Sequence, residues 1–262
     1  MDLGLKGKVA IVTGSSSGLG FAAARLFALE GADVVVCSRT ERIEAAAETI
    51  RSSTSARVLS VRADLTRPEE VGQLVSRALE SLGRIDILVA NAGGPAAGSF
   101  LSLTPDDWTR AFHTTLMSTV LLCYAVVPHM LNQGGGSIVA SQSFSVKQPA
   151  DRLVLSNSLR LAVIGLVKSL ANELGPKGIR VNSINPGWTR TERAEQLIAD
   201  RARANRTSPD VEQAKITAEI PVGRLGIPEE YAQAVVWLAS PAASYVHGHA
   251  LMVDGGIVKA SL

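Results

Sequence analysis

The segment from Val9 to Gly20 constrains the fold more than any other part of the chain. It reads Val-Ala-Ile-Val-Thr-Gly-Ser-Ser-Ser-Gly-Leu-Gly, an apolar run that breaks at Gly14 and continues as a helical pattern from Phe21. Strand, glycine turn and helix form a dinucleotide cradle, because glycines admit a pyrophosphate to the backbone and the helix N-terminus offers unpaired N–H groups. A plain strand-to-helix turn is the alternative. The candidate cradle residues are Gly14, Ser16, Ser17, Gly18, Leu19 and Gly20.

Short apolar runs alternate with helical patterns along the rest of the chain. The predicted strands are Val9–Thr13, Asp33–Cys37, Arg57–Val61, Ile85–Ala90, Gly136–Ser141, Ile179–Ile184 and Ala250–Val253. The predicted helices are Gly20–Glu30, Glu41–Arg51, Pro68–Leu82, Asp106–Leu131, Leu153–Leu174 and Pro228–Ser240. Such alternation indicates β-α-β units around a parallel sheet, and no linker or repeat marks a second domain. We expect one α/β domain over residues 1–262, a Rossmann-like, doubly wound parallel sheet in three α/β/α layers.

The composition excludes several classes of function. Residues are 46% hydrophobic but only 4% aromatic, which suits a sheet covered on both faces by aliphatic side chains. A net charge of +2 is too small to indicate a nucleic-acid or acidic-membrane partner. The four histidines and two cysteines are scattered without ligand spacing, so no metal site is expected.

The chain shows no targeting or membrane signal. Its N-terminus lacks an apolar signal region, and no uninterrupted apolar run approaches the roughly 18 residues of a membrane span. Cys37 and Cys123 lie in apolar runs, which is typical of buried thiols in a reducing compartment. We therefore expect a cytoplasmic protein.

The end of the second predicted strand bears on the choice of cofactor. An acidic residue at this point binds the ribose hydroxyls of NAD, whereas a nearby arginine accommodates the 2′-phosphate of NADP. The chain has Ser38 and Arg39 here. Ser38 carries no negative charge that would repel a 2′-phosphate, and the Arg39 guanidinium offers it paired N–H donors. This pair favours NADP(H) over NAD(H), unless Arg39 is only a solvated loop cation.

Three further motifs follow predicted strands. They are Ala63-Asp64-Leu65, Ala90-Asn91-Ala92-Gly93 and Asn185-Pro186-Gly187-Trp188-Thr189-Arg190-Thr191. In this order, and with the glycine turn, they resemble the short-chain dehydrogenase/reductase family over nearly the whole chain, most closely its 3-oxoacyl-carrier-protein reductase branch. The resemblance implies an oxidoreductase acting on a carbonyl or alcohol substrate. It also implies cofactor contacts from Asp64, Leu65, Asn91, Ala92, Gly93, Pro186, Gly187, Thr189 and Thr191, and a small substrate-covering helical insertion over 190–220.

The same resemblance locates a catalytic tetrad that is mostly lost. Similar enzymes carry an asparagine, a serine, and a tyrosine and lysine spaced Tyr-x-x-x-Lys. The corresponding positions here are Thr115, Ser143, Ser156 and Arg160, so only the serine is kept. No shifted alignment restores the tyrosine, because the three tyrosines of the chain lie elsewhere, at Tyr124, Tyr231 and Tyr245. Arg160 is still expected to donate to the cofactor ribose.

Two functions remain open. One is an oxidoreductase with an altered proton donor, for which Lys147 and Asp151 are the nearest ionisable candidates unless they are solvated loop charges. The other is a catalytically inactive protein that senses the cofactor or assembles with an active relative. Ser143 lies in a serine-rich turn, so its hydroxyl has a second reading as a local cap of backbone groups.

The predicted helices 106–131 and 153–174 are apolar on nearly every face. A helix that is apolar all round is buried on more than one side. Similar proteins pair these helices between subunits, so we expect a homodimer or homotetramer through them and the C-terminal strand. A larger core within a monomer is the alternative.

Overall fold

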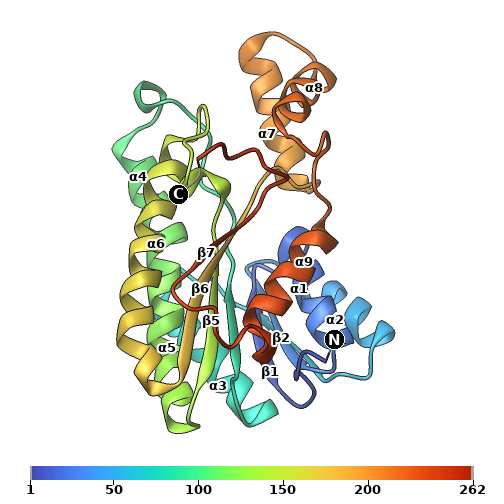
Figure 1. The fold of residues 1–262 in the computed structure, drawn as a ribbon, viewed down its shortest axis with the longest axis vertical. Helices are drawn as coiled ribbons and strands as arrows, with labels where there is room; N and C mark the ends of the chain where they lie inside the picture. Colours follow the sequence, from blue (N-terminus) through green and yellow to red (C-terminus); the bar gives the residue numbers. More distant parts are fainter. Residues whose placement is uncertain (1, 261–262) are drawn as a thin grey trace.

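Seven parallel strands form one sheet in the order β3-β2-β1-β4-β5-β6-β7. The computed structural model describes residues 2–260 (Figure 1). The strands are β1 (Val9–Thr13), β2 (Asp33–Ser38), β3 (Val58–Arg62), β4 (Ile87–Ala90), β5 (Gly136–Ser141), β6 (Ile179–Pro186) and β7 (Ala250–Val253). The predicted fold class is confirmed, and each predicted strand is present with ends displaced by at most two residues.

Nine α-helices occur in the described residues. They are α1 (Gly18–Leu29), α2 (Arg42–Ser53), α3 (Pro68–Leu82), α4 (Pro105–Ala111), α5 (Ser118–Asn132), α6 (Val154–Leu174), α7 (Glu192–Asn205), α8 (Pro209–Glu219) and α9 (Pro228–Ala239). Helices α3, α5 and α6 pack on one face of the sheet, and α1, α2 and α9 pack on the other. Helices α7 and α8 project beyond the end of the sheet (Figure 1).

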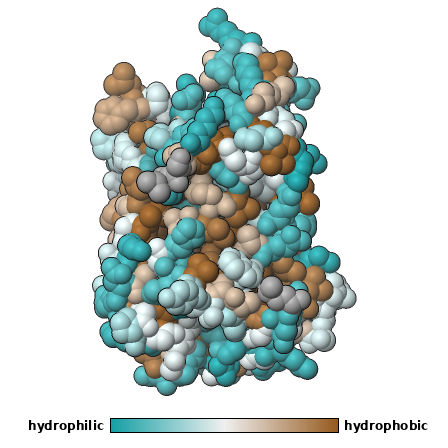
Figure 2. Space-filling view, viewed as in Figure 1, coloured by the Kyte–Doolittle hydropathy of each residue, from teal (hydrophilic) through white to brown (hydrophobic). Residues whose placement is uncertain are grey.

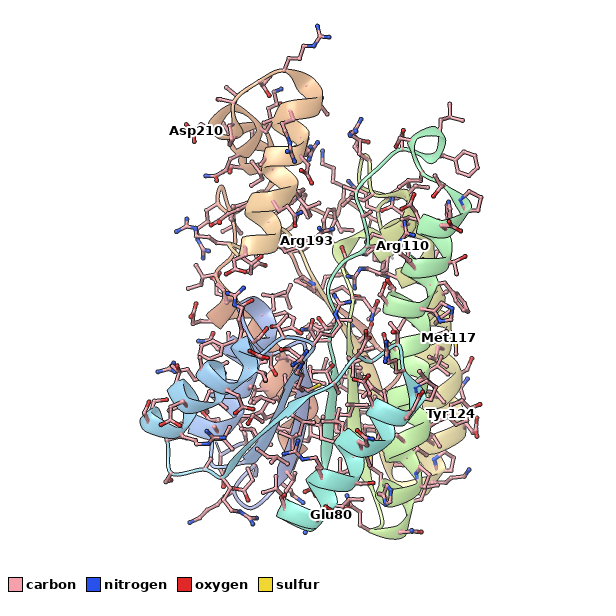
Figure 3. The ribbon with its side chains drawn as sticks, turned by 180° about the vertical axis from the view of Figure 1, so that it is seen from behind. Glu80, Arg110, Met117, Tyr124, Arg193 and Asp210 are labelled. Atoms are coloured by element: carbon pink, nitrogen blue, oxygen red, sulfur yellow. The ribbon has the colours of Figure 1, made fainter. Side chains whose placement is uncertain are left out.

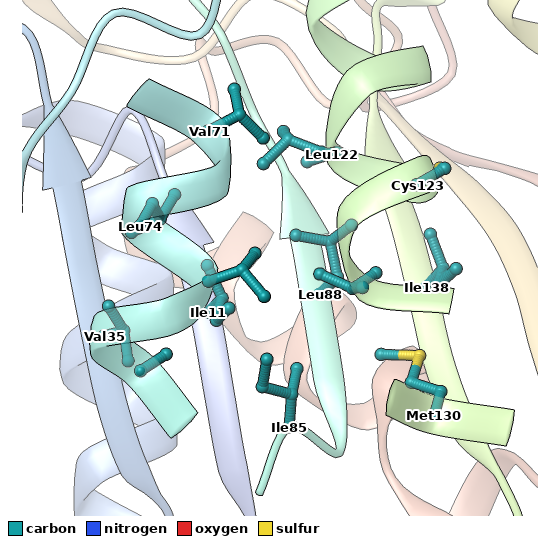
Figure 4. Close-up of a cluster of buried hydrophobic side chains, with 14 of the residues drawn as sticks. Ile11, Val35, Val71, Leu74, Ile85, Leu88, Leu122, Cys123, Met130 and Ile138 are labelled. Carbon is teal, nitrogen blue, oxygen red and sulfur yellow. The ribbon is translucent and has the colours of Figure 1, made fainter. Parts of the chain in front are cut away.

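The two faces of the sheet carry separate hydrophobic cores because side chains alternate along a strand. Val9 and Ile11 of β1 belong to the first core, and Ala10 and Val12 belong to the second. Figure 4 shows Leu88 of β4 in the first core, between the sheet and the covering helices. Both cysteines are buried, and burial raises the pKa of each thiol to about 12, as expected for inert core thiols.

The predicted helix 106–131 is present as a continuous helical stretch over Pro105–Asn132, but it is not α-helical throughout. A π-helical segment, η2 (Phe112–Met117), separates α4 from α5 and carries Thr115 inward. The π turn changes the helical period over only the six residues of η2, which mix apolar and polar side chains. So short a change of period leaves no readable signal in the pattern of the longer helix.

The outer faces of α5 and α6 remain apolar and exposed. Tyr124 is 78% exposed and Leu161 is 53% exposed, and Figure 3 shows Tyr124 on the outward side of its helix. The stretches Pro105–Asn132 and Val154–Lys177 are long and apolar enough, by length and composition, to cross a membrane. Core helices of α/β proteins have the same composition, and the inner sides of both pack on the sheet.

Candidate active site

A cavity of about 420 Å³ opens where the carboxyl ends of β1, β4, β5 and β6 meet. From β1 the chain continues to β2, which lies on one side of β1, and later returns to β4 on the other side of β1. A crevice therefore forms at the carboxyl ends of β1 and β4. Predicted site residues in the cavity lining are Gly14, Ser17, Gly18, Leu19, Gly20, Asn91, Ala92, Gly93, Ser143, Ser156, Arg160, Pro186, Gly187, Thr189 and Thr191. Those outside it are Ser16, Ser38, Arg39, Asp64, Leu65 and Thr115.

The glycine turn is built from positions that exclude a side chain. Gly14 and Gly18 have φ values of 59° and 57°, which L-residues rarely adopt. A Cβ on Gly20 would overlap the carbonyl oxygen of Gly14, and a Cβ on Gly14 would lie 2.8 Å from the Asn91 carbonyl oxygen. Asn91 Nδ2 fixes the turn by donating to Gly14 O at 3.2 Å. The backbone of the cradle is therefore open to a ligand.

The first turn of α1 leaves its N–H groups free. Ser17 precedes the helix but its side chain makes no capping hydrogen bond, and the first turn contains no acidic residue. The positive end of the helix dipole thus faces the cavity without an acidic side chain in its own first turn, which is the arrangement that binds phosphate. Thr191 closes the other side, since a Cβ on Gly18 would lie 3.3 Å from its Cγ2. These features fit a dinucleotide pyrophosphate.

The residues after β2 and β3 form a separate polar group. Arg39 is exposed and forms no ion pair with a described residue, whereas Ser38 Oγ bonds Thr40 O at 3.1 Å. Partial burial acts to raise the pKa of Asp64. Hydrogen bonds from Thr66 and the charge of Arg39 outweigh it, so the pKa lies below its ordinary value. The Arg39 guanidinium is available to an anionic ligand group.

The structure brings Ser143, Ser156 and Arg160 to the cavity but leaves Thr115 behind it. Ser143 Oγ accepts from the Ser145 N–H at 3.2 Å, so the local-cap interpretation describes its present contact. Ser156 Oγ accepts from Arg160 Nε at 3.1 Å and lies 3.4 Å from Ser145 Oγ. Thr115 Oγ1 is buried and has no hydrogen-bond partner among residues 2–260.

Arg160 is the most unusual group of the site. It is only 9% exposed, and its Nη1 donates to Ser141 O at 3.4 Å, Gln142 O at 3.2 Å and Gln142 Oε1 at 3.4 Å. Burial, and after it the charge of Arg193, lowers the pKa of the guanidinium to about 10. Every acceptor it contacts is neutral. A buried cation without a carboxylate loses solvation that neutral acceptors only partly replace.

Lys147 and Asp151 lie outside the lining of this cavity. Both side chains are exposed, and Asp151 instead lines a neighbouring cavity of about 350 Å³ with Arg152 and Trp188. Their positions favour the interpretation as solvated loop charges over a direct part in proton transfer.

Sequence reasoning did not single out Arg193 as a site residue. Its Nη2 donates to Pro95 O at 2.5 Å, and a Cβ on Gly94 would lie 3.2 Å from the guanidinium. Figure 3 shows Arg193 at the sheet-proximal end of α7. The sequence did carry one signal for Arg193, because it lies in the first turn of a helix, where the helix dipole disfavours a cation.

Tyr231 is also closer to the site than its sequence position suggests. It is buried at the start of α9, and its Oη has no hydrogen bond of acceptable geometry among the described residues. Burial raises the pKa of the phenol to about 12, although nearby Ser141 and the charge of Arg160 oppose the rise. The phenol does not line the cavity, so it cannot reach a substrate there.

Comparison with known proteins agrees with this geometry. The family described as Enoyl-(Acyl carrier protein) reductase matches residues 14–258. Dehydrogenase/reductase SDR family member 4 of Bos taurus is 37% identical over 254 residues, covering 96% of this chain and 88% of the relative.

Two solved structures share the fold over nearly their whole length. L-sorbose reductase from Gluconobacter frateurii, complexed with NADPH and L-sorbose, has a TM-score of 0.93 and 35% identity, covering 99% of this chain and 100% of the other. A 7α-hydroxysteroid dehydrogenase complexed with NADH has a TM-score of 0.90 and 33% identity, covering 99% and 97%. The resemblance inferred from the motifs is confirmed, and the chain belongs to the short-chain dehydrogenase/reductase family.

Proposed function

We propose that this protein is an NADP(H)-binding oxidoreductase that acts on a carbonyl or alcohol and uses an atypical proton donor. The observation that carries the proposal is one cavity shared by the Gly14–Gly20 cradle and by Ser143, Ser156 and Arg160. The NADPH and NADH complexes among the structural neighbours support a nicotinamide cofactor.

The preference for NADP(H) rests on Arg39. Its exposed guanidinium has no carboxylate partner in the described chain, and Ser38 adds no negative charge beside it. A planar fork of N–H donors suits a 2′-phosphate. The cradle holds the pyrophosphate, while Asn91, Thr191 and Arg160 line the path toward the nicotinamide. When bound, the nicotinamide supplies or accepts the hydride.

The proton requires a different source from that of similar enzymes. Ser143 Oγ is available to a substrate oxygen once it leaves Ser145 N–H, and Arg160 stabilises negative charge that develops nearby. Ser156 is too short and too weakly acidic to act as a phenol does, so water or a group on the substrate delivers the proton. A positioned acid contributes roughly 3–5 kcal/mol, whereas positioning contributes about 7–11 kcal/mol. Reduced turnover is therefore expected rather than none.

Helices α7 and α8, within the insertion 190–220, are proposed to cover the substrate. Arg193, Ala194, Gln196 and Leu197 of α7 already line the cavity. Exposed apolar groups on α5 and α6, and the sheet edge at β7, are proposed to join subunits in a homodimer or homotetramer. A mass measurement in solution tests this assembly.

A catalytically inactive, cofactor-binding protein is the second candidate. It is favoured by the lining of the cavity, in which no residue of the described range 2–260 supplies a phenol or ammonium group. Turnover on a carbonyl and alcohol panel that is abolished by Ser143→Ala or Arg160→Ala would exclude it.

The first experiment is a calorimetric titration with NADPH, with NADH alongside. Micromolar or tighter binding of NADPH, with weaker binding of NADH, supports the proposed site. Equal binding of both removes the preference for NADP(H), and no binding of either removes the proposal.

A further inference from the structure

Two arginines line this cavity without a carboxylate at ion-pair distance. Among the residues that the structure describes, the ionisable members of the lining are Arg160, Glu192 and Arg193. Glu192 is already paired, since its carboxylate accepts from Arg42 Nη2 at 2.8 Å and Nη1 at 3.2 Å. Neither Arg160 nor Arg193 forms an ion pair with any carboxylate of residues 2–260. Asp200 opposes the lowering of the Arg193 pKa from a longer distance, so the positive charge of the two arginines is only partly compensated.

Arg160 is held in place by neutral groups. Its Nε donates to Ser156 Oγ and its Nη1 to acceptors of Ser141 and Gln142, while no described residue accepts from Nη2. The side chain is more than nine-tenths buried and lines the cavity. Burying a cation in this way is unfavourable unless an anion arrives to compensate it.

Arg193 lines the same cavity from α7, whereas Arg160 belongs to α6. It is partly buried, its pKa is lowered by that burial, and its Nη2 is fixed by the Pro95 carbonyl at 2.5 Å. Its position in the first turn of α7 opposes the helix dipole, which is a further electrostatic cost. A single anionic ligand in this cavity would offset both the burial of the two cations and the unfavourable position of Arg193 in the helix dipole.

We propose that Arg160 and Arg193 form an anion subsite, and that the substrate is a 2-oxo or 2-hydroxy acid whose carboxylate they bind. Guanidinium groups match a carboxylate with paired N–H donors. Arg160 contacts Ser156 and lines the same cavity as Ser143, so a carboxylate bound there holds the neighbouring carbon close to both hydroxyls. The cofactor phosphates have their own site at the free N–H groups of α1, at the Gly14–Gly20 turn. This inference rests on the proposed function.

The test compares 2-oxohexanoate with hexan-2-one, in which a methyl group replaces the carboxylate. Both are titrated calorimetrically into the NADPH-saturated protein and into variants Arg193→Gln, Arg193→Lys and Arg190→Gln. Arg190 is exposed and absent from the lining, so it controls for loss of one charge. We expect the acid to bind at least roughly tenfold more tightly than the ketone. Arg193→Gln should remove most of that difference, Arg193→Lys should restore part of it, and Arg190→Gln should leave it unchanged.

Three results overturn the inference. Equal affinity for acid and ketone means that no anion subsite exists. Equal losses in Arg193→Gln and Arg190→Gln mean that only net charge matters. A loss of NADPH affinity in Arg193→Gln, with binding of the acid unchanged, assigns the cation to the cofactor. If NADPH itself fails to bind, the proposed function fails, and the same titrations of the cofactor-free protein still decide whether the anion subsite exists.

Discussion

The cradle at Gly14–Gly20 and the reaction centre at Ser143, Ser156 and Arg160 face one cavity but differ in what they are made of. The cradle is backbone, and its function depends on the absence of side chains at Gly14 and Gly20. The reaction centre consists of side-chain ends, which can be exchanged while the strand and helix that carry them keep their places. A site for phosphates therefore keeps its motif, whereas a site for proton transfer can lose its chemistry without losing its fold.

Restoring the missing groups tests this contrast most strongly. In Ser156→Tyr/Arg160→Lys, a phenol and an ammonium return to the positions used by similar enzymes. We expect turnover to rise by about 10²–10⁴-fold, the usual contribution of a positioned acid. Steady-state kinetics with NADPH on a carbonyl panel measures it. Unchanged turnover together with unchanged NADPH affinity would favour the inactive, cofactor-binding candidate.

Gly20→Ala tests the cradle rather than the reaction centre. Its Cβ would overlap Gly14 O, so the turn must shift away from the geometry that receives phosphate. We expect a loss of NADPH affinity of roughly 100-fold and destabilisation of about 1–3 kcal/mol. Calorimetry and urea unfolding measure the two effects.

Gly72→Ala is the matched control for Gly20→Ala. Gly72 lies in α3 with nothing within 4 Å of an added Cβ, so alanine should stabilise by about 0.5–1 kcal/mol and leave binding unchanged. Parental NADPH affinity in Gly20→Ala would show that the cradle is not the cofactor site.

Arg39→Ala separates the two nicotinamide cofactors. Loss of one charge-assisted contact should weaken NADPH binding by roughly tenfold and leave NADH binding almost unchanged. Parallel titrations give the ratio of the two dissociation constants. Arg77→Ala removes an exposed arginine of α3 and controls for net charge. An equal loss for both cofactors would indicate that Arg39 does not contact the 2′-phosphate.

Tyr231→Phe gives the smallest expected effect. The phenol oxygen is buried without a hydrogen-bond partner among residues 2–260, so removing it should stabilise the protein by up to about 1 kcal/mol. NADPH binding and turnover should not change, because the hydroxyl does not reach the cavity. Thermal unfolding and the same kinetic assay test both statements. A tenfold loss of turnover would instead link this phenol to Arg160 in proton transfer.

The fold was predictable because its signals are local. Short apolar runs and period-3.6 patterns, together with the glycine turn, identify strands and helices without knowledge of distant residues. The π-helical segment η2 was missed because a change of period over six residues of mixed polarity leaves no readable signal. The candidate residues were also predictable wherever they follow a strand, as Asn91 and Gly187 do, since carboxyl ends of parallel strands meet at one edge.

By itself the sequence determined the order of strands and helices along the chain, the backbone cradle at Gly14–Gly20, and the loss of the tyrosine and lysine at Ser156 and Arg160. Tertiary structure decided the electrostatics of the cavity. It buried Arg160 among neutral acceptors, turned Arg193 of α7 toward the cavity, and paired Glu192 with Arg42 instead of with either of them. The physical reason is that the electrostatic energy of a charged side chain depends on its burial and on the groups that surround it. Those partners lie as many as 150 positions apart in the chain, as Arg42 and Glu192 do.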